Sequence, residues 1–217
     1  MLGRDEAYIG VLIDDLVTKG TEEPYRLFTS RAEFRLLLRQ DNADLRLTAK
    51  GYELGLVSEA QWNLLQQKVA LINRGEEQLK QSLPLESTNA ILEAKGEPLS
   101  KERTAVSKLV ARPSLSLKDF EVFFSSEDWW TPEVVEQLEI EIKYGGYIQR
   151  ERDNVAKVKR LNDKEIPQDF NYDAVKGLSY EGRDKFKRIQ PTTIAQASRI
   201  SGISQSDIQV LLVYMGR

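Results

Sequence analysis

The chain has 217 residues, of which 41% are apolar and 30% are charged, a balance typical of a globular protein rather than a disordered one. It contains no cysteine and no histidine, which excludes disulfides, thiolate nucleophiles, Cys/His zinc sites and histidine acid–base catalysis. The formal net charge of −3 excludes a uniformly basic nucleic-acid binder, although a local basic face remains compatible with it.

Targeting and catalytic motifs are missing from the sequence. Its apolar runs are too short to span a bilayer, and the opening residues "MLGRDEAYIG" do not read as a secretory signal, so we expect a cytoplasmic protein. No glycine-rich nucleotide motif and no G-x-S-x-G motif occurs. The composition therefore favours a binding module over an enzyme that works alone.

The first third of the chain is predicted to be helical with turns between the helices. A helix is expected over residues 7–20, and Ser30 is expected to cap a second helix over 31–39. The Asn/Asp-rich stretch 40–48 predicts a turn, after which Thr48 would cap a short helix.

The middle of the chain holds two strong helix signals. Ser58 precedes a helix with apolar residues at helical spacing, in which Gly75 is a predicted fray point. Residues 83–130 are predicted to form short, proline-interrupted helices, and their aromatic residues are interpreted as core. Thr131 would cap a long helix, which the pair Gly145 and Gly146 is expected to interrupt, as a kink or as a close backbone approach.

Three short helices are predicted near the C-terminus, over residues 179–189, 192–201 and 204–215. The last two, with a tight turn at Gly202, resemble a helix-turn-helix. The second of them carries no basic residue before Arg217, so a packed helical hairpin is favoured over a DNA-reading motif.

The predicted fold class is therefore all-α, with two packed helical subdomains. We expect residues 1–20 to be a linker, residues 21–125 to form the first subdomain, and residues 126–217 to form a helical bundle that ends in the helix-turn-helix-like hairpin.

Three arginines in the stretch "FTSRAEFRLLLR" suggest a binding ridge. If the stretch is helical, Arg31, Arg35 and Arg39 fall within about 80° of one another on its surface. Guanidinium groups grip phosphate oxygens, so the ridge could bind a nucleic acid. The alternative is a set of local ion pairs with Glu33, Asp41 and Asp44, and the pattern alone favours these ion pairs.

Two other charged features leave similar alternatives. Residues 140–160 are rich in basic residues and tyrosines, which is typical of a solvated helix face but also suits an RNA or partner surface. Asp14 and Asp15 form an acid pair in an apolar run, and an ion pair with a nearby base is favoured over a metal or proton-handling site.

Long blocks of the sequence, in order, resemble the GidA/MnmG family. These include "RDEAYIGVLIDDLVTKGTEEPYRLFTSRAEFRLLLRQDNADLRLT", "YGGYIQRE" and "GLSYEGRDKFKRIQPTTIAQASRISGISQSDIQVLLVYM". The resemblance implies the C-terminal fragment of the FAD-containing large subunit of an enzyme that installs a carboxymethylaminomethyl group on the wobble uridine of tRNA. FAD and NADH would then serve the full-length enzyme, with no cofactor, no catalytic residue and no activity in this fragment alone.

The resemblance also implies partners and sites. The partners would be tRNA, a GTPase subunit and a second copy of the full-length protein, without DNA or membrane. We expect tRNA contacts at Arg26, Arg31, Arg35, Arg39, Arg46, Arg150 and Lys157. Contacts with the GTPase are expected at Ile200, Ile208, Leu211, Leu212 and Tyr214. The alternative is an interaction module that docks the GTPase while tRNA is held elsewhere. A catalytic role for Asp14 and Asp15 is the least favoured of the three readings.

Overall fold

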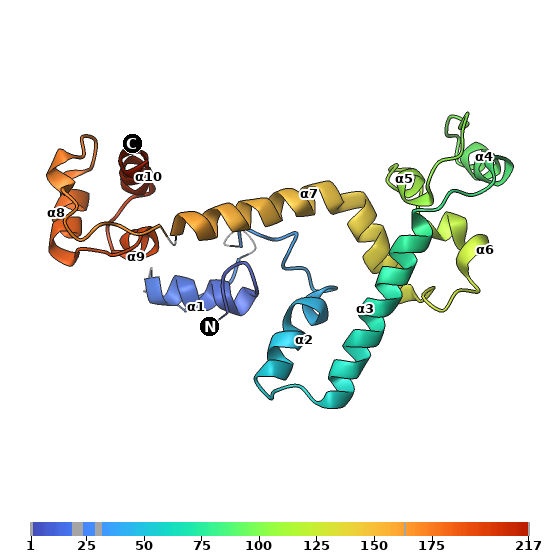
Figure 1. Cartoon of the computed structure of the whole chain (residues 1–217), viewed down its shortest axis with the longest axis horizontal. Helices are drawn as coiled ribbons and strands as arrows, with labels where there is room; N and C mark the ends of the chain where they lie inside the picture. Colours follow the sequence, from blue (N-terminus) through green and yellow to red (C-terminus); the bar gives the residue numbers. More distant parts are fainter. Residues whose placement is uncertain (1, 19–23, 29–31, 163, 217) are drawn as a thin grey trace. The chain divides into compact units, whose positions relative to one another are not determined.

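The computed structural model describes residues 2–18, 24–28, 32–162 and 164–216 (Figure 1). These residues form ten α-helices and no strand, which confirms the all-α class. No helix among them is long and apolar enough to cross a membrane. In chain order the α-helices are α1 (Tyr8–Thr18), α2 (Ala43–Glu53), α3 (Glu59–Leu79), α4 (Leu85–Ala94), α5 (Val106–Val110), α6 (Glu121–Phe124), α7 (Pro132–Asn162), α8 (Tyr180–Ile189), α9 (Ile194–Arg199) and α10 (Gln205–Met215), with two 3₁₀ turns, η2 (Leu117–Phe120) and η3 (Tyr172–Ala174).

The chain divides into two compact units. The first consists of Met1–Leu37 and Glu151–Arg217, and the second consists of Leu38–Arg150, so α7 contributes residues to both. The division differs from the expected boundary between residues 125 and 126. Phe124 and Trp129 flank that position and pack in one hydrophobic cluster, so the chain is not divided there.

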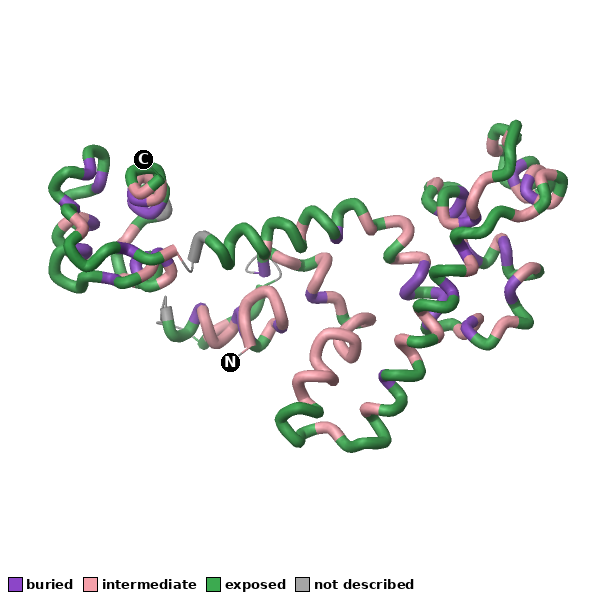
Figure 2. Tube along the Cα trace, viewed as in Figure 1, coloured by how far each residue is buried: buried purple, intermediate pink, exposed green. Residues whose placement is uncertain are grey.

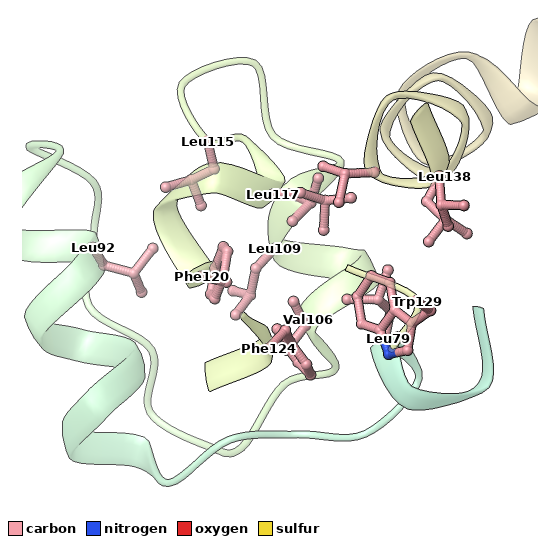
Figure 3. Packing of buried hydrophobic residues seen from close by; sticks show 13 residues of the cluster. Leu79, Leu92, Val106, Leu109, Leu115, Leu117, Phe120, Phe124, Trp129 and Leu138 are labelled. Atoms are coloured by element: carbon pink, nitrogen blue, oxygen red, sulfur yellow. The ribbon is translucent and has the colours of Figure 1, made fainter. Parts of the chain in front are cut away.

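The core of the second unit is built from the short helices and from α3 and α7 (Figure 3). Its aromatic residues confirm the interpretation of this stretch as core, because Phe120, Phe124 and Trp129 are buried. Gly75 is not a fray point, since α3 continues to Leu79. A Cβ at Gly75 would lie 2.5 Å from Leu138 Cδ1 and 2.8 Å from Trp129 Cε3, so the helix needs glycine where the core meets it.

Local capping starts the two longest helices as predicted. Ser58 forms a capping box with Gln61 at the start of α3, which satisfies N–H groups that have no partner inside the helix. Thr131 Oγ1 accepts a hydrogen bond from the Val134 N–H at 3.4 Å at the start of α7. α7 runs unbroken through Gly145 and Gly146, and no described atom lies within 4 Å of a Cβ built at either, so the predicted close backbone approach is wrong, while the kink stays a prediction.

The arginine-rich segment does not form the predicted helix. Residues 33–37 form successive turns, and Ser30 and Arg31 lie outside the described residues. The Leu37 N–H donates to the Phe34 carbonyl at 3.1 Å and to the Glu151 carboxylate at 3.2 Å, so the four-residue helical pattern does not continue. The predicted turn after it is also wrong in part, because α2 begins at Ala43 and contains Thr48 within it.

The C-terminal part of the first unit is a small bundle of α8, α9 and α10, as predicted. Its buried residues, purple in Figure 2, include Phe186, Ile194 and Leu211. Ser204 and Asp207 form a capping box at the start of α10, and Asp207 also accepts a hydrogen bond from the Ser179 N–H at 2.8 Å. The Asp207 carboxylate therefore joins the start of α10 to the start of α8.

The pKa of Asp207 reflects these contacts. Burial alone would raise the pKa, but hydrogen bonds from the Ser204 hydroxyl and from the backbone N–H groups of Ser179 and Ser204 lower it overall. Gly202, at φ 82°, makes the predicted tight turn between α9 and α10, where other residues would be strained.

Candidate nucleic-acid interface

Arg39 is held by acidic residues of its own unit. Its Nε donates to both carboxylate oxygens of Asp41, at 3.1 and 3.0 Å, and Glu141 lies 3.7 Å from its guanidinium group. Gln137 holds the same aspartate through a 2.6 Å hydrogen bond. The Arg39 side chain is only 14% exposed, so this arginine fits the ion-pair alternative.

Arg46 is also tied to its surroundings. Its Nε donates to the Asn42 side-chain oxygen at 2.8 Å, and its guanidinium group donates to the Arg39 carbonyl at 3.0 Å. Asp44, an acid predicted to pair with the arginines, instead accepts a hydrogen bond from Lys68 at 2.7 Å. Arg39 and Arg46 therefore contact residues at the start of the second unit.

Arg26 and Arg35 differ from them. Both lie in the first unit, and both are exposed. Among the described residues neither side chain makes an ion pair or a side-chain hydrogen bond. Arg31, which would complete the predicted ridge, lies outside the described residues. The segment thus presents two exposed guanidinium groups whose donors are available to a ligand.

The basic half of α7 provides two further exposed cations. Arg150 stacks over the exposed ring of Tyr147, with its guanidinium carbon 5.8 Å from the ring centroid. Lys157 lies two turns further along and is exposed as well. Lys159, in contrast, makes a 2.7 Å ion pair with Asp5. The basic residues of this helix therefore also separate into paired and available groups.

A partly buried ionic network around Arg4 was not predicted. Arg4 lies 3.1 Å from Asp14, 2.8 Å from Asp15 and 2.8 Å from Glu33, and the Tyr25 hydroxyl donates to Asp15 at 2.8 Å. Burial alone would lower the pKa of Arg4, but the hydrogen bonds to Glu33 and Asp15 outweigh it and raise the pKa.

The Arg4 network explains the acid pair of α1. Both Asp14 and Asp15 are used by Arg4, and Asp14 also lies 3.8 Å from Arg199. The described part of the chain contains no acidic cluster that could hold a metal ion. The nearby base expected for this pair is thus Arg4, which no motif distinguishes from other arginines.

The predicted partner-binding residues fall into two groups. Ile208 and Leu211 are buried in the bundle core, where they contact the other helices of the first unit. Ile200 and Leu212 are half-buried, while Tyr214 is 39% exposed and packs edge-on against Phe170. Val213, which was not predicted, is the most exposed apolar side chain of α10 at 62%.

Two family descriptions match consecutive parts of the chain. Residues 59–152 match the "tRNA modifying enzyme MnmG/GidA C-terminal helical domain". Residues 154–217 match the "tRNA modifying enzyme MnmG/GidA C-terminal helical bundle". The junction between the two matches lies close to the Arg150/Glu151 division between the two structural units.

Known proteins are similar over the whole chain. Two relatives are named tRNA uridine 5-carboxymethylaminomethyl modification enzyme MnmG, and each is 50% identical to this chain. The protein from Christiangramia forsetii matches over 100% of this chain and 36% of its own length. The protein from Listeria monocytogenes matches over 99% of this chain and 34% of its own length. The crystal structure of Aquifex aeolicus GidA (form II) matches with a TM-score of 0.69 and 44% identity, over 100% of this chain and 34% of that one. This chain thus spans about a third of the length of these relatives. The chain belongs to the GidA/MnmG family and corresponds to its C-terminal helical region.

Proposed function

We propose that this chain is the tRNA- and partner-binding region of a flavoenzyme that modifies the wobble uridine of tRNA. The observation that carries the proposal is a set of exposed basic residues without acidic partners among the described residues, in a chain whose relatives are named for tRNA uridine modification. The set, called the available cations below, consists of the four predicted tRNA contacts that meet this description: Arg26, Arg35, Arg150 and Lys157.

The available cations suit phosphate groups. An arginine with free donors can hold a phosphate through two parallel hydrogen bonds, and a lysine attracts it as a point charge. The guanidinium group of Arg150 lies over the ring of Tyr147. The Arg150 side chain is therefore already restricted before it binds, and it loses less rotamer freedom when it contacts a phosphate. Contacts of this kind position an RNA without reading its sequence.

The other arginines predicted to contact tRNA are not among the available cations. Arg39 and Arg46 shape the segment before α2 through their hydrogen bonds and are not expected to contact phosphates directly. Arg31 stays a prediction as a phosphate contact, because it lies outside the described residues.

Catalysis is assigned to other parts of the whole protein. The described residues form no strand, so they do not supply the βαβ unit that a dinucleotide-binding fold places beneath a cofactor pyrophosphate. As the resemblance to the family implies, we propose that FAD and NADH bind outside this region and that this region alone has no turnover. The whole protein is proposed to act in the cytoplasm, and its homodimerisation stays a prediction.

A tRNA titration tests the proposal. Fluorescence anisotropy of labelled tRNA with this chain, at 50 and 200 mM salt, is expected to show binding that weakens steeply with salt, because each phosphate contact releases a counterion. Full-length protein binding tRNA while this chain does not, at either salt concentration, would place the tRNA site elsewhere.

Docking of a GTPase subunit is the second candidate function. The exposed apolar Val213, which precedes Tyr214 in the last helix, favours it, because a partner could bury this side chain. Replacing Val213 with Asp should abolish co-purification of the GTPase without changing the melting temperature, and Gln209→Asp on the same helix serves as control. Retained co-purification would move the docking surface elsewhere.

A further inference from the structure

A cavity of about 380 Å³ lies in the first unit, between the segment that follows α7 and the connection from α8 to α9. It is lined by Gln168, Gln190, Tyr172 and Thr192, together with Ile166 and two prolines. None of its lining residues is charged. Its volume is at the lower end of the range found for small-molecule sites.

Backbone and aromatic contacts hold the walls of this cavity in place. The Ile166 N–H donates to the Thr192 carbonyl at 2.9 Å, which ties the two lining segments together. Tyr172 is 6% exposed and stacks on Phe186, with ring centroids 5.5 Å apart. The cavity is therefore built from ordered elements, a condition for binding a small group without a large cost of ordering.

Gln190 has an unusual backbone conformation in the wall of the cavity. It ends α8 at φ 48° and ψ 60°, and it is the one non-glycine residue with positive φ that the described part of the chain contains. The four other described residues with positive φ are glycines. Pro191 follows directly, and a proline further restricts the backbone of the residue before it. Glycine would adopt this conformation without strain.

The lining chemistry indicates the class of ligand. A cavity without charge is unsuited to a phosphate, whereas side-chain amides donate to and accept from the edges of nucleobases. Single-stranded RNA loops offer unstacked bases for recognition of this kind. We propose that this cavity binds one unpaired nucleobase of the tRNA, with Gln190 and Gln168 contacting the edge of the base. The inference rests on the proposed function, because it specifies a base-reading site in addition to the phosphate contacts.

Tyr172 adds a hydrogen-bond donor to the cavity wall. Burial raises the pKa of its hydroxyl, so the group stays protonated at neutral pH. The Thr192 hydroxyl and N–H are not available to a ligand, because both donate to the Gln196 side-chain oxygen at 2.8 Å. Gln168, Gln190 and Tyr172 are thus the residues for a base to use.

The Gln190→Gly variant separates a ligand-binding role from a structural one. Relief of the strain should raise the melting temperature by about 3 °C, while loss of the amide should weaken tRNA binding about fivefold or more. Asn tolerates positive φ better than Gln and keeps the amide, so Gln190→Asn should recover part of the affinity. Gln168→Ala should also weaken binding, whereas Gln209→Ala, an exposed glutamine of α10, should leave it unchanged. Native tRNA affinity in Gln190→Gly overturns the inference, whatever its melting temperature.

A second measurement tests the cavity without tRNA. Millimolar adenosine, guanosine, cytidine and uridine are added separately to the chain, and the NMR signals of the side-chain amides of Gln168 and Gln190 are followed. At least one nucleoside should shift both signals in the native chain. Unshifted signals with all four nucleosides overturn the inference, even if the chain binds tRNA through the available cations. Shifted signals in a chain that fails to bind tRNA would instead contradict the proposed function.

Discussion

Two groups of basic residues in this chain look alike in sequence and differ in their surroundings. Arg4 and Arg39 each contact several carboxylates, and their side chains are only 21% and 14% exposed. Arg35 and Arg150 are exposed, and neither contacts an acid among the described residues. The guanidinium groups of the first pair lie against carboxylates of the fold, whereas those of the second pair make no ion pair among the described residues.

The difference shows that the position of an arginine in a periodic pattern does not reveal its task. Arg35 and Arg39 are four residues apart in one apparent stripe, yet they belong to different compact units. An arginine that stabilises the fold should affect stability when it is replaced, and one that binds phosphate should affect affinity and its salt dependence. The following variants separate these two outcomes.

The largest effect is expected from Arg4→Ala. The variant removes the ionic partner of Asp15, which is 1% exposed and keeps its hydrogen bond from Tyr25, and breaking a buried ion pair in this way costs about 3 kcal/mol. Urea denaturation should show this loss in the free energy of unfolding. Arg26→Ala, at an exposed arginine, should stay within about 0.5 kcal/mol of the native chain. Equal stability of the two variants would contradict the structural role of Arg4.

Arg39→Ala is expected to have a smaller effect. Asp41 keeps its hydrogen bond from Gln137, so the loss in unfolding free energy should be about 1–2 kcal/mol. The matched control is Arg35→Ala, which removes the same side chain four residues earlier. If Arg35→Ala proves as destabilising as Arg39→Ala, the two arginines do not differ as the structure indicates.

The Arg39–Asp41 contact should also depend on pH. Burial alone would raise the pKa of Asp41, but hydrogen bonds from Gln137 and Arg39 lower it overall. A carboxylate with a lowered folded pKa contributes stability above its unfolded pKa and loses it as the pH falls.

The stability advantage of the native chain over Asp41→Asn should therefore be about 1 kcal/mol at pH 7 and shrink below about pH 4. Urea denaturation at pH 7, 4 and 3 measures it. A difference that stays constant over this range would show that the charge of Asp41 is not what stabilises the contact.

The smallest effect is expected from Tyr147→Ala. An exposed cation–π contact contributes about 0.5–1 kcal/mol, so without the ring Arg150 is less ordered and tRNA binding should weaken about twofold. Tyr144→Ala, at an exposed tyrosine one turn earlier, is the matched control for anisotropy titrations. Identical affinities for the two variants would remove Tyr147 from the interface.

Features with local causes could be predicted from the sequence. The capping boxes at Ser58 and Ser204 depend on residues three positions apart, and both helices begin where expected. The aromatic cluster around Trp129 was predicted as core because large apolar rings are rarely left in water.

Features that depend on residues far apart in the chain could not be predicted from the sequence. The turns at residues 33–37 involve Glu151, which is 114 positions from Leu37 in the chain. The first unit combines the two ends of the chain, so no single linear boundary describes it. The roles of Arg4 and Gln190 depend on tertiary contacts and on a backbone angle, neither of which has a sequence motif.

The central claim is that the available cations bind tRNA, and the salt dependence of affinity tests it most directly. Arg26, Arg35, Arg150 and Lys157 are replaced together with Gln, and tRNA affinity is measured between 50 and 200 mM salt. The matched control replaces four other exposed basic residues with Gln, namely Lys101, Arg103, Lys108 and Lys118. The account predicts that the slope of log affinity against log salt falls by about one unit for each phosphate that the variant no longer neutralises, at an unchanged melting temperature. A slope and an affinity equal to those of the control variant would contradict it.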